Sequence, residues 1–150
     1  MGLDFTVYAK YKGTDADVKD VELAYGRKSW ELVHFLKLDA SQFDVPVWRE
    51  NWNELMEALE VVGDHIDDIW DAFEIVEYAP DDFPEMIVTD EVKRLIATYE
   101  FWYNKTFGET PTLGYDFSLG YIKNFWEARE EADYYFNHPE TWEVRAEISY

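Results

Sequence analysis

The sequence predicts an α+β domain, in which a small antiparallel sheet made by the N- and C-terminal strands packs against about five helices. Both ends of the chain alternate apolar and polar residues, as half-buried strands do. Between them, apolar side chains recur at steps of three or four, which is typical of amphipathic helices. Aromatic residues form 19% of the 150 residues, so a single domain over 1–150 can bury a substantial core.

Three segments are expected to form strands. Residues 3–11 alternate well and give the first strand. After a turn over 13–17, residues 19–25 are expected to form a second strand, with one face made by Val21, Leu23 and Tyr25. The last strand is expected at 142–150, with one face made by Trp142, Val144, Ala146, Ile148 and Tyr150. We expect it to pair with the N-terminal strand and close the domain.

Short polar residues mark the beginnings of two expected helices. Ser29 is a candidate N-cap for a short helix over 30–38, and the following residues 43–46 are expected to be a connector. Thr89 is a candidate N-cap for a helix over 90–105. A loop bracketed by Pro80 and Pro84 is expected to precede that helix.

The C-terminal third is expected to hold one long helix. Residues 108–117 contain Gly and Pro and are expected to form the loop that precedes it. Ser118 is a candidate N-cap, and the helix is expected to run to about Phe136. It would end at Asn137, His138 and Pro139, because Pro has no backbone N–H to continue it.

Negative charge is concentrated in one central stretch. The formal charge at pH 7 is −20, from 33 acidic and 13 basic residues. Residues 50–92 contain 15 of these acids and no Lys or Arg. Because affinity for a phosphate backbone comes from Lys and Arg, we expect no direct binding to nucleic acid. A basic protein surface is the expected partner.

This acidic stretch has the pattern of a folded helical region. Its apolar positions recur at helical spacing and are Trp48, Trp52, Leu55, Leu59, Val62, Ile66, Ile69, Phe73 and Val76. Gly63 interrupts the pattern, and Asp64 after it is a candidate N-cap, so the region is either one bent helix or two helices in series. Residues 50–92 contain no base to relieve the repulsion between neighbouring acids.

Two interpretations of the acidic face follow. One is a solvated surface that keeps the protein soluble. The other is a surface that imitates nucleic acid: 43 helical residues would span ~64 Å, giving one charge per ~4.3 Å, against one per ~3.4 Å of a DNA strand. The candidate partner-binding residues are Glu50, Glu54, Glu57, Glu60, Asp64, Asp67, Asp68 and Asp71.

The sequence shows no motif that identifies a reaction. It has no Cys, no Gly-x-Ser-x-Gly elbow and no Gly-rich phosphate loop, so no catalytic residue and no cofactor are assigned. A possible polar cluster near the N-terminal sheet comprises Asp4, Tyr25, Arg27 and His34. The alternative interpretation of that cluster is an internal salt bridge between Asp4 and Arg27.

Metal ligation finds little support in the spacing of His and carboxylates. Glu31 and His34 have the Glu-x-x-His spacing of di-iron bundles, but those sites need a second copy and further Glu residues. Asp64, His65 and Asp68 could share one cation, but adventitious binding of a divalent ion to an acidic helix is favoured over a dedicated site. No metal site is therefore assigned.

The first 36 residues resemble a group of small uncharacterised phage and prophage proteins. The resemblance lies in the opening Met-Gly-Leu-Asp, in residues 22–28 (Glu-Leu-Ala-Tyr-Gly-Arg-Lys) and in the following helix with His34. Gly26 stands where the group usually has Trp. The resemblance implies a phage origin and carries no activity. It places the protein in the cytoplasm of an infected or lysogenic bacterial host, consistent with an N-terminus that lacks the pattern of a secretory signal.

Three hypotheses for function remain open. The first is a non-enzymatic phage-type inhibitor, an anti-CRISPR or other anti-defence protein, that binds the basic surface of a host nucleic-acid-binding protein through its acidic helical face. The second is a small metal-dependent enzyme that uses Glu31, His34 and the Asp4–Arg27 pair. The third is an interaction or structural module whose acidity confers only solubility. No apolar run approaches the 18 residues of a membrane span, so no membrane contact is expected, and the oligomeric state stays open.

Overall fold

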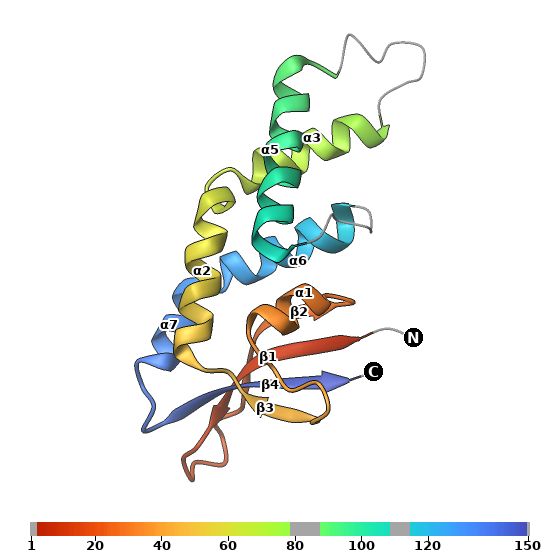
Figure 1. Cartoon of the computed structure of the whole chain (residues 1–150). Coiled ribbons are helices and arrows are strands. Elements are labelled where there is room, and N and C mark those ends of the chain that lie inside the picture. The colour runs from red at the N-terminus through yellow and green to blue at the C-terminus, as the bar shows by residue number, and fades with distance from the viewer. Residues whose placement is uncertain (1–2, 79–87, 109–114, 150) are drawn as a thin grey trace.

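The computed structural model describes residues 3–78, 88–108 and 115–149, with the backbone alone for Tyr78 and residues 115–118. Its elements, in chain order, are β1 (Asp4–Tyr11), β2 (Val21–Arg27), α1 (Trp30–Phe35), β3 (Asp44–Pro46), α2 (Arg49–Gly63), α3 (Ile66–Tyr78), α5 (Asp90–Phe107), α6 (Tyr115–Glu127), α7 (Arg129–Phe136) and β4 (Trp142–Ser149) (Figure 1). The α+β class is confirmed. The loop expected at Pro80–Pro84 lies outside the described residues.

The sheet is antiparallel and has the strand order β2-β1-β4-β3. The pairing of the first strand with the last is confirmed: Asp4 lies opposite Ser149, and the ladder continues to Tyr11 opposite Trp142. The apolar residues of both strands share one face, where Val7 lies opposite Ala146. This face is buried because the helices cover it (Figure 1).

The second strand, expected at 19–25, runs from Val21 to Arg27 and does not keep the expected single face. A β-bulge lies in the β1–β2 pairing, because Val7 pairs with Ala24 whereas Tyr8 pairs with Glu22. The extra residue, Leu23, is buried together with Ala24, so the strict alternation expected for residues 19–25 is wrong. Tyr25 is half-buried, and its backbone N–H donates to the side chain of Asn124 on α6.

The segment expected to be a connector is the edge strand β3. Asp44, Val45 and Pro46 pair with the far end of β4, opposite Glu147, Ala146 and Arg145. Three residues that include a Pro give no alternating pattern, and Pro is accepted here because an edge strand leaves one side unpaired. The strand therefore depends on a partner about a hundred residues later in the chain.

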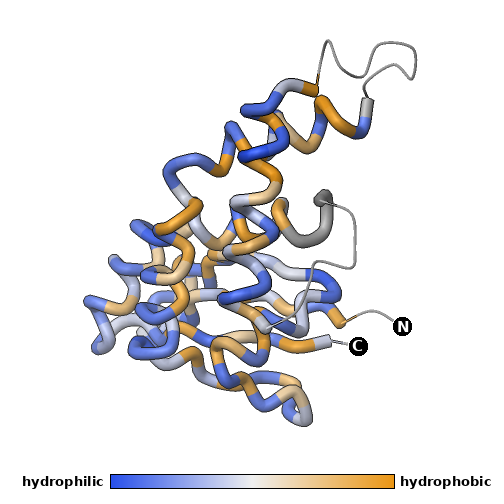
Figure 2. Tube along the Cα trace, turned by 45° about the horizontal axis from the view of Figure 1, so that its top comes forward, coloured by the Kyte–Doolittle hydropathy of each residue, from blue (hydrophilic) through white to orange (hydrophobic). Residues whose placement is uncertain are grey.

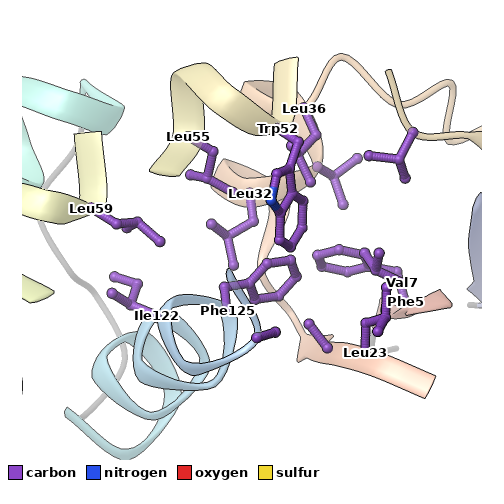
Figure 3. Close-up of a cluster of buried hydrophobic side chains, with 14 of the residues drawn as sticks. Phe5, Val7, Leu23, Leu32, Leu36, Trp52, Leu55, Leu59, Ile122 and Phe125 are labelled. Atoms are coloured by element: carbon purple, nitrogen blue, oxygen red, sulfur yellow. The ribbon is translucent and has the colours of Figure 1, made fainter. Parts of the chain in front are cut away.

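The core lies between the sheet and the helices. Figure 3 shows Phe5 of β1, Leu32 of α1 and Trp52 of α2 close to Phe125 of α6. The ring of Phe125 lies 5.6 Å from that of Phe5 and 5.8 Å from that of Trp52, centroid to centroid. The helices alternate hydrophilic and hydrophobic residues along their turns (Figure 2), so each buries one face and exposes the other.

Several helices begin or end at residues other than those predicted from the sequence. Ser29 is the N-cap residue of α1, as expected, but its hydroxyl makes no capping hydrogen bond and donates to the carbonyl of Arg27. The helix ends at Phe35 and not at Leu38. The expected long C-terminal helix begins earlier, at Tyr115, so residues 115–117 are not loop, and it is interrupted at Ala128 to give α6 and α7. The N-cap of α5 is confirmed, since Thr89 Oγ1 accepts from the Val92 N–H at 3.3 Å.

Candidate acidic interface

The acidic region consists of two helices in series, α2 and α3, which run in different directions (Figure 1). This settles the alternative between a bent helix and two helices. Asp64 adopts the C-cap position of α2 and does not cap α3. The carboxylates consequently lie along two shorter axes and not along one straight rod.

The two helices carry their charge at different densities. At 1.5 Å per residue α2 is ~22 Å long, and its four glutamates give one charge per ~6 Å. By the same rise α3 is ~20 Å long, and its five acids give one charge per ~4 Å. The value for α3 is close to the ~3.4 Å of a DNA strand, and that for α2 is lower.

The apolar stripe of the region is buried over most of its length. Trp52, Leu55 and Leu59 of α2 are at most 1% exposed, and Ile69 of α3 is 1% exposed. Trp48, at the N-cap of α2, is 59% exposed and so departs from the expected stripe. Val76 of α3 is 46% exposed and also departs from the expected stripe. The amphipathic character predicted for the region is otherwise present.

All eight candidate partner-binding residues have exposed side chains. Among the described residues, Asp67 alone of the eight makes an ion pair, with Lys123 Nζ of α6 at 2.9 Å. The hydrogen bond to Asp67 raises the pKa of Lys123 above its ordinary value. The expectation that no base relieves the acidic repulsion is therefore wrong at Asp67, because the fold brings in a base from 56 positions later in the chain.

The acidic surface is larger than the sequence indicated. A cleft of about 430 Å³ lies between α2 and the α6–α7 segment. Glu57 and Glu60 line its α2 side, and Glu130 and Asp133 line its α7 side. The two α7 acids were not candidates, because about seventy residues separate them from α2 and only packing brings the two segments together.

The floor of this cleft is aromatic. Trp126 of α6 lies against α2 at Gly63, where a Cβ would come within 2.2 Å of the ring atom Cε2. The guanidinium carbon of Arg129 lies 4.1 Å from the centroid of the Trp126 ring, and Arg129 Nη1 donates to the Trp126 carbonyl at 2.8 Å. The ring is thus held between the α2 backbone and a cation.

The polar cluster expected near the N-terminal sheet is only partly assembled. Arg27 Nε lies 3.7 Å from Asp4 Oδ1, as in the salt-bridge interpretation. Burial, and then the nearby Asp4, raise the pKa of Tyr25. His34 is not part of this group: it lies on α1, with its ring 5.9 Å from that of Trp30, centroid to centroid.

Glu31 and His34 do not form a shared site, because Glu31 is hydrogen-bonded to another helix. Glu31 Oε1 accepts a hydrogen bond from Tyr103 Oη of α5 at 2.6 Å, which ties α1 to α5. Within residues 3–78, 88–108 and 115–149, no group of three or more His and acidic side chains is arranged to hold a metal ion. This includes Asp64, His65 and Asp68.

The best-connected polar network was not expected from the sequence. On the sheet face away from the helices, Asp44 of β3 accepts from Tyr8 Oη at 2.5 Å and from Arg145 Nε at 2.6 Å. Arg145 Nη1 also donates to Glu143 at 2.6 Å. Burial and the bond to Asp44 raise the pKa of Tyr8 to about 12. Burial alone would raise the pKa of Asp44, but these hydrogen bonds outweigh it and hold the pKa below its usual value.

This network joins the edge strand β3 to β4 beside it and to β1, the next strand of the sheet. Tyr8 belongs to β1, Asp44 to β3 and Arg145 to β4. A carboxylate that accepts two short hydrogen bonds from different strands holds those strands together.

None of the described helices is long and apolar enough to cross a membrane. Comparison with protein-family models, with curated protein sequences and with solved structures gives no match to this chain.

Proposed function

We propose that this protein is a non-enzymatic inhibitor that binds the basic surface of a nucleic-acid-binding protein through the acidic faces of α2 and α3. The proposal rests on the exposure of the eight candidate acids and on how few of them are paired with a base. All are exposed, and seven of them form no ion pair with another described residue. Such carboxylates keep their full negative field, which attracts and orients a basic partner.

Exposed apolar side chains favour a docking surface over a surface that serves only solubility. Apolar side chains are exposed beside the carboxylates of α2: Trp48, at its N-cap, is 59% exposed, and Val61 is 63% exposed. Interfaces commonly combine charged residues with exposed aromatic or aliphatic anchors. A surface that serves only solubility gains nothing from exposing them.

The target class follows from the resemblance to phage proteins and from the charge. A phage-type protein whose acidic helices compete with nucleic acid would act on a host defence effector, such as a restriction or CRISPR protein, in the bacterial cytoplasm. The mechanism would be occupation of a basic groove, with fast association that weakens as salt rises.

The test is capture of host proteins by the tagged full chain from nuclease-treated bacterial lysate, at low and at high salt. A captured nucleic-acid-binding protein should be released by salt and displaced by DNA added as competitor. Replacing Glu54, Glu57, Asp64 and Asp68 by Lys should abolish its binding, because this takes the net charge of residues 49–78 from −9 to −1.

A matched control keeps the same change in net charge away from α2 and α3. Its substitutions to Lys are at exposed acids elsewhere, namely Asp17, Glu22, Glu100 and Glu140. The control should retain most of its binding. Equal binding by wild type and by the α2–α3 variant, or a captured protein that DNA does not displace, would refute the proposal.

A further inference from the structure

Helix α5 differs from the other helices in its charge. Among the described helices, α5 alone carries as many basic as acidic residues. Its charged residues are the bases Lys93, Arg94 and Lys105 and the acids Asp90, Glu91 and Glu100. In a chain with a net charge of −20, α5 is therefore the helix at which a second copy of the chain would meet the least repulsion.

The outer face of α5 exposes a large aromatic side chain. Phe101 is 71% exposed, more than any other large hydrophobic side chain among the described residues. Residues at steps of four lie along one side of a helix, and here they form an exposed row, which we call the α5 stripe. The stripe consists of Lys93, Ala97, Phe101 and Lys105. A partner that covered it would remove the Phe101 ring from water.

Contacts on the opposite face fix the rotation of α5. Trp102 Nε1 donates to the Ala58 carbonyl of α2 at 3.0 Å, and Tyr103 Oη donates to a carboxylate of α1 at 2.6 Å. The Tyr99 ring lies 5.6 Å, centroid to centroid, from the Phe73 ring of α3, which α5 crosses (Figure 1). Because three helices hold the buried face, the α5 stripe stays at the surface.

The charges on the outer face of α5 are available to a partner. Among the described residues, Lys93, Glu100 and Lys105 form no ion pair. Arg94 Nη2 lies 3.7 Å from Glu91 Oε1, and these two side chains are 75% and 74% exposed. An ion pair so exposed contributes little to stability and can exchange for a pair with another molecule.

We propose that two copies of this chain associate through their α5 stripes, with the helices antiparallel about a two-fold axis beside Ala97. Lys93 stands four positions before Ala97 and Glu100 three positions after it, so Lys93 lies opposite Glu100 of the second copy. In the same register the Arg94 guanidinium lies over the Phe101 ring of the second copy, as a cation–π contact. Ala97 is small and lets the two helices approach, and the symmetry forms each contact twice.

The two ends of α5 are complementary as well. Asp90 and Glu91 lie in the first turn, and Lys105 lies in the last turn. Antiparallel packing places the first turn of one copy beside the last turn of the other, so unlike charges and opposite ends of the helix dipoles meet. This inference goes beyond the proposed function. The α5 stripe shares no residue with the eight candidate acids, so a dimer would carry two acidic surfaces.

The test is sedimentation equilibrium of the full chain at ~0.15 M salt, where the Debye length is about 8 Å. The concentration is raised from ~10 μM to ~1 mM, because a small and partly charged interface gives a weak dimer. The mean mass should rise from 17.9 kDa toward twice that value. A mass that stays at 17.9 kDa over the whole range would overturn the proposal.

A charge exchange tests the antiparallel register. K93E should weaken the dimer about tenfold, because two like-charge contacts replace two ion pairs. E100K should weaken it by a similar factor, although this change reduces the net negative charge and so relieves the general repulsion between copies. The double variant K93E/E100K restores unlike charges at both contacts and keeps the wild-type net charge. It should dimerise within about twofold of wild type.

A pair of exposed phenylalanines tests the centre of the interface. F101A should weaken the dimer about tenfold, because the ring that Arg94 covers is lost. Phe43 is 66% exposed and lies outside the α5 stripe, so F43A should stay within about twofold of wild type. Circular dichroism checks that both variants fold. Equal effects of F101A and F43A, a stronger dimer with E100K, or a double variant no better than K93E would each overturn the α5 dimer.

Discussion

The hydrogen-bonded group of Tyr8, Asp44 and Arg145 gives the sharpest prediction about stability. β3 has only three residues, so its own ladder with β4 is short. Asp44 adds two side-chain hydrogen bonds, one to β1 and one to β4. Replacing Asp44 by Ala removes both acceptors and leaves the Arg145 guanidinium with Glu143 as its remaining carboxylate partner.

The magnitude follows from the kind of bond and from its exposure. A hydrogen bond to a charged group contributes ~1.5–3 kcal/mol net. The Asp44 and Arg145 side chains are 30% and 21% exposed, so solvent screens part of this contribution. We expect D44A to lower the free energy of unfolding by ~2–3 kcal/mol. For a chain of this length that corresponds to a fall in Tm of ~5–10 °C.

The assay is urea unfolding followed by circular dichroism, with D17A as the control. Asp17 is exposed, and D17A removes the same single negative charge from a protein of net charge −20. Because both variants lose one negative charge, the difference between their free energies of unfolding does not include the effect of reduced charge repulsion. The Asp44 pKa is held below its usual value, so its contribution should be present at neutral pH and be lost as the pH falls below ~4. Equal free energies of unfolding for D44A and D17A at pH 7 would show that the hydrogen bonds of Asp44 do not stabilise the fold.

Two further predictions test single features of the fold. The pKa of Tyr8 is raised to about 12 from 10.0, so the neutral phenol stabilises the fold below pH 10 and this contribution is lost as the pH rises toward 12. Tyr8→Phe should therefore reduce the loss of stability that wild type shows over that range, measured by urea unfolding; an unchanged alkaline loss would contradict it. Gly108 ends α5 with φ of 75°, and no atom of the described residues lies within 4 Å of the position a Cβ would take. Gly108→Ala should cost ~1 kcal/mol through backbone strain alone, and a rise in Tm would show that the cap does not need glycine.

Much of the fold could be predicted because it depends on local pattern. The alternation of residues 3–11 and 142–150 specified two strands with one apolar face each, and both are present. Helical spacing specified α2, α3 and α5, since a side chain three or four positions along lies on the same face. Ser29 was correctly placed at the N-cap of α1, but its capping hydrogen bond could not be predicted, because the same hydroxyl can bond a nearby carbonyl instead.

The elements that could not be predicted depend on partners far away in the chain. β3 exists because β4 pairs with it, and the bulge in β2 exists because the register with β1 shifts by one residue. Neither leaves a periodic signal in its own few residues. The interruption at Ala128 likewise divides a segment whose helical pattern is continuous in the sequence.

At the candidate site, local periodicity is enough to predict that the central stretch is acidic and amphipathic, with its carboxylates facing water. The physical reason is the high cost of burying an unpaired charge. Which of these charges are neutralised, and which face one another, depends on how the helices pack. Lys123 meets Asp67, and α7 brings Glu130 and Asp133 across from α2, because packing of the helices on a shared core places distant residues side by side.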